Sequence, residues 1–321
     1  MPKVSVVIPA YNAIAYLPET MESVLNQTFN SFEVIVVNDG SLDKTEQWVA
    51  QIQDPRVKLI SQENQGLSGA RNTGILHARG DYIAFLDSDD IWEPTKLEKQ
   101  ASILDEHPEV GLVYTWVAYI NEQSQSTGKV FKHQAEGDVW KKLTEHNIVE
   151  CGSVAMVRRS CFETCGVFDR TLVSFVEDWD MWLRIASKYP FKVVKEPLVY
   201  YRQRSNSASK NWEAMAQSFQ IVIEKAFASV PTELQYLKNR SYASANLCLA
   251  WKPLQNQQKD YQKTIYFLKQ ASNYYPGIRF SKEFIRLRIA AITMRWLGNN
   301  GYKQLLTIFH TLRRYAVAIA R

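Results

Sequence analysis

The sequence predicts an α/β fold, with a mostly parallel sheet flanked by helices, followed by an all-α C-terminal region. Short and nearly continuous apolar runs alternate with segments of helical periodicity through the first 90 residues. Such runs are typical of parallel strands that are covered on both faces. Polar motifs directly follow several of these runs, and after about residue 211 the pattern changes to helices alone.

The first part of the chain is expected to contain strands and helices in alternation. The expected strands are 3–8, 32–37, 56–60, 82–86, 110–120, 152–157, 191–195 and 198–202. The expected helices are 14–27, 43–53, 67–79, 94–106, 138–146, 159–165 and 178–189. Asp43 is a candidate N-cap, and Pro94 lies in the first turn of its helix, where proline is tolerated. The rest of 121–150 is polar and predicted to form loops.

The second part of the chain is expected to be helical throughout. Helices are predicted at 212–229, 232–251, 258–273, 281–297 and 302–319, with breaks at Pro231, Pro253, Pro276-Gly277 and 298–301. We therefore expect two domains, 1–211 and 212–321.

Charge is distributed unevenly between these two expected domains. Residues 1–211 carry 22 Lys and Arg against 28 Asp and Glu, whereas residues 212–321 carry 16 against 5. The segment 302–319 has an apolar stripe with basic residues opposite, which predicts an amphipathic helix. Two interpretations stay open: a solvated basic surface on packed helices, or peripheral contact with an anionic membrane. Nucleic acid is not an expected partner, because no recognised binding motif is present.

The cysteine pattern and the N-terminus indicate where the protein acts. The four cysteines form no C-x-x-C pair and have no histidine at metal-site spacing, so a zinc site is not expected. The chain begins with a strand pattern instead of a signal peptide, and no apolar run reaches about 18 residues. We expect a cytoplasmic protein, with peripheral contact with the inner face of the cytoplasmic membrane as the alternative.

The strongest functional signal is the acidic cluster Asp87-Ser88-Asp89-Asp90, which follows an apolar strand. Three neighbouring carboxylates repel one another, and a divalent cation relieves this repulsion. Mg²⁺ and Mn²⁺ bind carboxylates together with substrate phosphates. The alternative is capping of helix 94–106, for which one Asp would suffice. The cluster therefore predicts a metal site.

Other polar motifs lie at the ends of the first strands, where ligands of parallel sheets gather. Asp39 could accept the imide N–H of a uracil edge, although Asp39-Gly40 could also be a simple tight turn. Arg71 could bind phosphate oxygens in a bidentate manner, or could form a surface ion pair.

Six ordered motifs resemble the signatures of family 2 glycosyltransferases of the GT-A fold. They are VSVVIPAYN (4–12), VIVVNDGSLDKT (34–45), ENQGLSGARNTGI (63–75), GDYIAFLDSDDIWEPTKLE (80–98), CGVFDRTL (165–172) and EDWDMWLRIA (177–186). The resemblance covers about 1–205, and it implies that a nucleotide sugar is the donor. It also implies that Pro9, Tyr11 and Asn12 line the nucleotide pocket, with Asp39 at the base and Ser41 near the ribose.

The resemblance also implies roles around the diphosphate. Arg71 would approach the diphosphate, Asp87 would hold the ribose, and Asp89 would hold Mn²⁺ or Mg²⁺. Ser88, between the two acids, is assigned to nucleotide-sugar binding. Relatives commonly carry Tyr-Arg-x-His after the last strand, whereas this chain has Tyr-Arg-Gln-Arg. The final residue, Arg204, cannot bind a metal, but it can neutralise diphosphate charge, so we assign it to donor binding.

A second carboxylate pair, Glu177-Asp178, lies far along the chain. The resemblance implies that Asp178 is the general base, with Glu177 beside it, while Trp179 and Asp180 shape the acceptor site. Transfer with inversion needs one base opposite the leaving diphosphate. The alternative is that these acids only cap helix 178–189.

The expected function is inverting transfer of a sugar from a UDP-type or dTDP-type nucleotide sugar to a hydroxyl of a glycan or lipid-linked acceptor. One alternative is a non-catalytic subunit that binds nucleotide sugars. A nucleotidyltransferase is less favoured, because it would need a glycine- and lysine-rich phosphate loop after the first strand, and PAYNAIAYLPET contains no glycine.

Overall fold

The computed structural model describes residues 1–172, 176–204, 212–255 and 260–319, and describes no side chain at 255, 299–300, 303 or from 305 onward. The chain divides into two compact units. One comprises Met1–Ser209 with Glu224–Ala228, and the other comprises Lys210–Ile223 with Ser229–Arg321. Whether 1–211 and 212–321 are separate domains, as the sequence predicts, stays a prediction.

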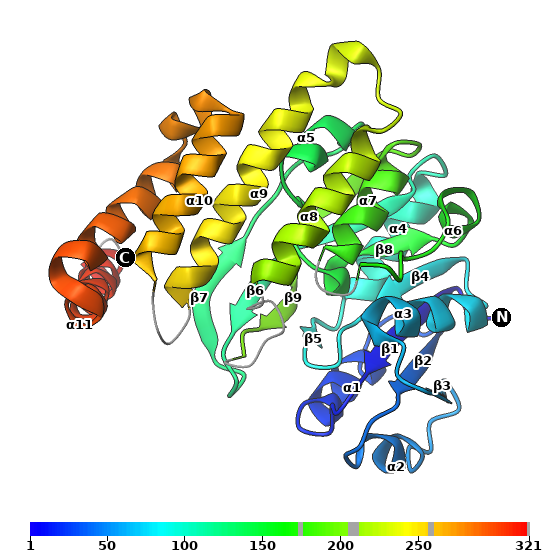
Figure 1. Ribbon diagram of the computed structural model, residues 1–321. Helices are drawn as coiled ribbons and strands as arrows, with labels where there is room; N and C mark the ends of the chain where they lie inside the picture. Colours follow the sequence, from blue (N-terminus) through cyan, green and yellow to red (C-terminus); the bar gives the residue numbers. More distant parts are fainter. Residues whose placement is uncertain (173–175, 205–211, 256–259, 320–321) are drawn as a thin grey trace. The chain divides into compact units, whose positions relative to one another are not determined.

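The strands of the described ranges form one mixed sheet in the first unit (Figure 1). They are β1 Val4–Ala10, β2 Phe32–Asp39, β3 Val57–Gln62, β4 Tyr82–Phe85, β5 Ile91–Trp92, β6 Leu112–Ile120, β7 Ser126–Phe131, β8 Met156–Arg158 and β9 Phe191–Arg202. The order is β3-β2-β1-β4-β8-β6-β9-β5, and β7 pairs with β6. Strands β1 to β4 are parallel, whereas β8 runs antiparallel to both β4 and β6.

Helices of the first unit flank this sheet and confirm the expected α/β fold. They are α1 Leu17–Leu25, α2 Thr45–Val49, α3 Gly66–His77, α4 Lys96–Glu106, α5 Trp140–Glu145, α6 Ser160–Cys165 and α7 Glu177–Ala186. Every residue of β1 and β2 is buried, as their apolar sequences require. Helix α3 packs closely on β1, because a Cβ on Gly74 would lie 2.1 Å from Cγ1 of Val7.

Three strands differ from the sequence expectation. β7 lies in the segment predicted as loops, and its residues are almost all exposed. Such a strand lacks the buried alternation that reveals strands in a sequence. The two short strands expected at 191–195 and 198–202 are one strand, β9, that continues through Pro197. The two-residue β5 was not expected.

The second unit is helical, as predicted. Its helices are α8 Trp212–Phe227, α9 Tyr236–Gln255, α10 Tyr261–Tyr274 and α11 Lys282–Ile319. The break expected at Pro253 is wrong, because α9 continues to Gln255. The break expected at 298–301 is a kink at Gly298, where φ is 64°. All side chains of the stripe expected in 302–319 lie outside the described side chains. None of the described helices is long and apolar enough to cross a membrane.

Candidate active site

The loop after β1 is hydrogen-bonded to the loop after β2. Asn12 adopts a left-handed backbone conformation, with φ at 48°. Its backbone N–H donates to the hydroxyl of Ser41 over 3.0 Å, and its side-chain oxygen accepts from the backbone N–H of Leu42 over 2.8 Å. Pro9 is buried in β1, whereas Tyr11 is 51 % exposed. The structure therefore brings Asn12 and Ser41 together at the strand ends, with an exposed tyrosine beside them.

Asp39 is the last residue of β2 and is buried. Its Oδ1 atom accepts hydrogen bonds from the side-chain amide of Gln62 over 2.6 Å and from the backbone N–H of Gln65 over 2.9 Å. Because both donors bind the same oxygen, the carboxylate is held in one orientation. Gln62 and Gln65 have no role in the sequence prediction, since neither type nor spacing singles them out.

Arg71 of α3 is buried between two carboxylates, with 1 % of its surface exposed. Its Nη1 lies 2.6 Å from Glu177, and its Nη2 lies 2.8 Å from Asp87. Burial disfavours the charged guanidinium, but Asp87 and Glu177 outweigh burial and raise the pKa of Arg71 above its usual range. A Cβ on Gly152 would lie 2.6 Å from Nη2, so a larger residue there would displace this guanidinium. Arg71 therefore connects the acidic cluster to the start of α7, and its contact with diphosphate stays a prediction.

The carboxylates of the acidic cluster have different surroundings. The carboxylate of Asp87 accepts a hydrogen bond from Nη2 of Arg71. The backbone N–H of Asp87 donates to the Ser153 hydroxyl over 3.1 Å. Asp90 is fully buried and accepts from the Ser153 hydroxyl over 2.6 Å and from the backbone N–H of Arg202 over 3.0 Å. Burial and the neighbouring acids raise the pKa of Asp90 well above its usual range. Asp90 is thus hydrogen-bonded to Ser153 and Arg202. It does not cap α4, so the capping alternative is wrong for this residue.

Asp89 pairs with the arginine that replaces the expected histidine. Nε of Arg204 lies 2.9 Å from Oδ2 of Asp89, and the two side chains are 39 % and 20 % exposed. Burial raises the pKa of Asp89, and the charge of Arg204 opposes this. The guanidinium of Arg204 also lies over the ring of Tyr16. Ser88 is half-buried between its acidic neighbours.

The donor set of this turn fits a divalent cation that shares its ligands with a substrate. Mg²⁺ usually binds through one or two carboxylates plus substrate phosphates, and not in an all-protein cage. Within the described ranges, no group of three or more His, Cys, Asp or Glu residues is arranged to hold a metal. Asp89 would therefore supply the protein carboxylate, with Asp87 next to it in the same turn.

Asp178 lies in the first turn of α7 and is half-buried. Its Oδ2 accepts from the amide of Asn147 over 3.4 Å, and its Oδ1 accepts from the backbone N–H of Trp179 over 2.6 Å. Burial and the charge of Glu177 raise the pKa of Asp178 to about 7, against the opposing charge of Arg71. A carboxylate with a pKa near neutrality suits a general base.

The sequence prediction also missed Ser153, Asn147 and Arg202. Ser153 and Asn147 lie in a stretch without a recognised motif, so no signal reveals their contacts. Arg202 lies in the Tyr-Arg-Gln-Arg segment, but the sequence does not show that this arginine is buried. Its side chain is fully buried and donates to the backbone carbonyl of Asp89 over 2.8 Å.

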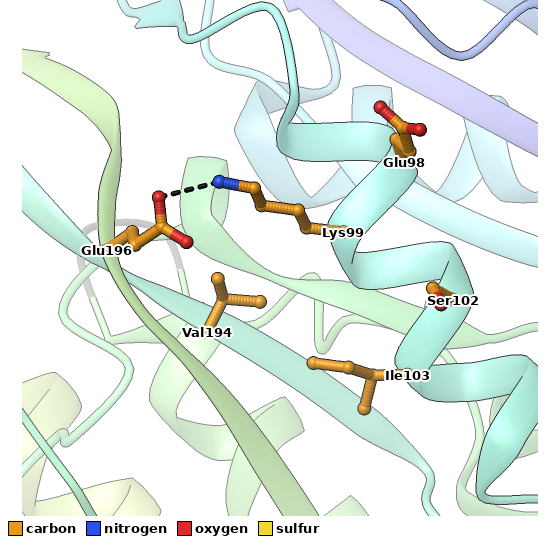
Figure 2. A pocket seen from close by; sticks show the side chains of 6 residues that line it. All are labelled: Glu98, Lys99, Ser102, Ile103, Val194 and Glu196. Atoms are coloured by element: carbon orange, nitrogen blue, oxygen red, sulfur yellow. Dashed lines mark hydrogen bonds and ion pairs between the residues drawn. The ribbon is translucent and has the colours of Figure 1, made fainter.

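A separate hollow does not include any of the predicted site residues (Figure 2). It has a volume of about 490 Å³ and is lined by Glu98, Lys99, Ser102, Ile103, Val194 and Glu196. An ion pair of 2.6 Å joins Lys99 of α4 to Glu196 of β9. These groups neutralise each other at the surface, so we assign no chemistry to this hollow.

Known proteins similar to this chain are glycosyltransferases. The family model described as glycosyl transferase family 2 matches residues 5–166. An uncharacterized glycosyltransferase of Rickettsia typhi is 33% identical over 222 residues, which cover 66% of this chain and 69% of the relative. The putative teichuronic acid biosynthesis glycosyltransferase TuaG of Bacillus subtilis is 32% identical over 224 residues, which cover 68% of this chain and 86% of TuaG.

Two solved structures share the fold. One is the mannosyltransferase PcManGT from Pyrobaculum calidifontis, in complex with GDP-Man and Mn²⁺, with a TM-score of 0.60 at 19% identity. The match covers 98% of this chain and 86% of the PcManGT chain. S. aureus TarS 1–349, in complex with UDP-GlcNAc, has a TM-score of 0.56 at 17% identity and covers 85% of this chain and 89% of its own. They confirm the predicted GT-A fold. Together with the family match, this establishes that the chain belongs to glycosyl transferase family 2.

Proposed function

We propose that the chain transfers a sugar, with inversion, from a UDP-type or dTDP-type nucleotide sugar to a hydroxyl of a glycan or lipid-linked acceptor. The observation that carries this proposal is the buried bridge of Arg71 between Asp87 and Glu177. It joins the acidic cluster to the first turn of α7, which supports a leaving-group side and a base side that lie close together. TarS and PcManGT were solved with UDP-GlcNAc and GDP-Man, which supports a nucleotide sugar as the donor class.

The base of the nucleotide would meet Asp39. A carboxylate accepts the imide N–H of uracil or thymine, and the fixed orientation of Asp39 favours one approach direction. The linked loops that carry Asn12 and Ser41 would form the wall beside it, together with Pro9 and Tyr11. Because a carboxylate also accepts from guanine, nucleotide binding is the measurement that decides the base.

The transfer step needs a proton acceptor and charge neutralisation. The acceptor hydroxyl would lose its proton to Asp178 as its oxygen attacks the anomeric carbon, and the diphosphate would leave from the opposite face. Arg204 would exchange its ion pair with Asp89 for the diphosphate oxygens. A divalent cation held by Asp89 would, when bound, stabilise negative charge on the leaving diphosphate.

Nucleotide binding is tested by the thermal stability of the protein. We expect UDP or dTDP, with Mn²⁺, to raise the melting temperature, because a ligand at a hundredfold excess over its Kd adds about 2.7 kcal/mol to the native state. Asp39→Ala should lose this shift, whereas Glu163→Gln, on the exposed surface of α6, should keep it. A shift with GDP alone would contradict the UDP-type donor.

Catalysis is tested with the donor that this panel identifies, by the release of nucleoside diphosphate. Asp178→Asn should keep the thermal shift and lose turnover, because it removes the proton acceptor but keeps the shape. Asp89→Ala should lose the part of turnover that depends on Mn²⁺. Full turnover by Asp178→Asn removes this residue as the base, and an inactive wild-type protein that binds donor favours the non-catalytic subunit.

A further inference from the structure

The first half of α11, residues 282–297, carries apolar side chains on two opposite faces. One face is buried within the second unit and consists of Phe284, Leu287, Ala291 and Met294. The other face is solvent-exposed and consists of Ile285, Ile289, Ile292 and Trp296, which are 46%, 59%, 44% and 80% exposed. These four residues recur at i, i+4, i+7 and i+11, so they form one line along the helix. We call them the α11 stripe.

The surroundings of the α11 stripe are basic. Arg288 and Arg295 are exposed and each lies three positions after an isoleucine of the stripe, on its flank. From residue 284 to the C-terminus, the sequence contains seven Lys and Arg residues and no Asp or Glu. The helix therefore presents apolar and positively charged groups to solvent together.

This combination identifies the chemistry of its partner. The buried face packs α11 within its unit, whereas the four side chains of the stripe leave 44–80% of their surface in solvent. Helices with an apolar line, basic flanks and a tryptophan lie in the headgroup region of anionic bilayers. A second copy is a poorer partner, because face-to-face pairing brings the arginines of both copies together.

We propose that the α11 stripe docks this protein on an anionic lipid surface. Ile285, Ile289, Ile292 and Trp296 enter the boundary between headgroups and acyl chains, while Arg288 and Arg295 meet lipid phosphates. The proposed docking surface lies before the kink at Gly298, whereas the amphipathic helix predicted from the sequence lies in the later segment 302–319. This inference concerns the second unit and does not rest on the proposed donor or base.

The test is sedimentation of the full chain with lipid vesicles. We expect binding to vesicles of two parts phosphatidylcholine and one part phosphatidylglycerol, weak binding to pure phosphatidylcholine, and release by high salt. Ile289→Glu with Trp296→Glu should abolish binding. Arg288→Gln with Arg295→Gln should weaken it roughly 30-fold, because each basic residue near the surface contributes to lipid affinity.

Leu76→Glu is the matched control, because Leu76 is 81% exposed on α3 of the first unit and should bind vesicles as the wild type does. Equal binding to neutral and anionic vesicles would overturn the proposal. So would undiminished binding by both double variants. A wild-type dimer that the Ile289→Glu, Trp296→Glu variant dissociates would assign the stripe to a second copy instead. The nucleotide thermal shift should be unchanged in these variants, which keeps this test separate from the proposed function.

Discussion

At the scale of single residues, the site depends on how four charged groups compensate one another. Glu177 raises the pKa of Asp178, while Arg71 lowers it and is itself shared between Glu177 and Asp87. Glu177 is ion-paired with Arg71 and raises the pKa of Asp178, so we expect it to act as a positioning residue for Asp178.

The pH dependence of turnover follows from this arrangement. In the proposed mechanism Asp178 must be ionised to accept a proton, so turnover should rise as the pH increases through about 7. Glu177→Gln removes a neighbouring negative charge and leaves Arg71 less neutralised, and both effects lower the pKa of Asp178. The acidic limb of the kcat/KM profile should therefore move to lower pH in this variant. An unchanged limb would show that another group limits the rate.

The motifs predicted which residue types gather at the strand ends, but not their partners. Asp39, Asp87, Asp89 and Asp178 could be named because each lies in a recognisable motif. The burial of Arg71 could not be predicted, because its partners lie on segments far away in the sequence. No motif predicts that His133 and His146 hydrogen-bond to each other over 2.9 Å, since the loops that carry them meet only in the fold.

At the scale of elements, the position of Arg71 depends on how closely α3 approaches the sheet. Gly74 lies one turn after Arg71 on the same helix and faces Val7 of β1. Near-continuous apolar strands could be predicted because a parallel sheet needs them, but exposed β7 could not, because it buries no face.

Gly74→Ala should lower the free energy of unfolding by about 1–3 kcal/mol, the usual cost of overpacking. The new methyl group would overlap Val7, so α3 must move away from β1. Leu76→Ala is the control on the same helix, because its side chain is exposed and its loss should change stability little. Urea denaturation followed by circular dichroism measures both. Equal stability of the two variants would refute a tight α3–β1 contact.

At the scale of the whole molecule, helix α8 is divided between the two units. Its last residues, from Glu224, belong to the unit that contains the sheet, and its earlier residues belong to the helical unit. Lys225, in the last turn of α8, lies 2.6 Å from Asp169 and 2.9 Å from the buried carboxylate of Asp180. The change of pattern near residue 211 could be predicted from the sequence, but this return of the chain could not, since no local signal marks it. A cytoplasmic location stays a prediction.

Lys225→Met should lower the free energy of unfolding by about 1–2 kcal/mol, since Asp180 loses one of its two cations and Lys225 is partly solvated. Lys225 helps to lower the pKa of Asp169 to about 2, against the effect of burial. This part of the stability is present above pH 4 and is lost as the pH falls towards 2. Lys269→Met, on the exposed surface of α10, is the control. Calorimetry at pH 7 and pH 3 should show a smaller difference from wild type at pH 3.

The pair formed by Arg204 and Asp89 has a consequence for selective inhibitors. Arg71 is enclosed, whereas Arg204 is 39 % exposed, so Arg204 is the more accessible guanidinium for a charged compound. Relatives with a histidine at this position offer a shorter side chain that is mostly neutral at pH 7. A compound that extends a carboxylate or sulfonate towards Arg204 should therefore discriminate between this enzyme and such relatives.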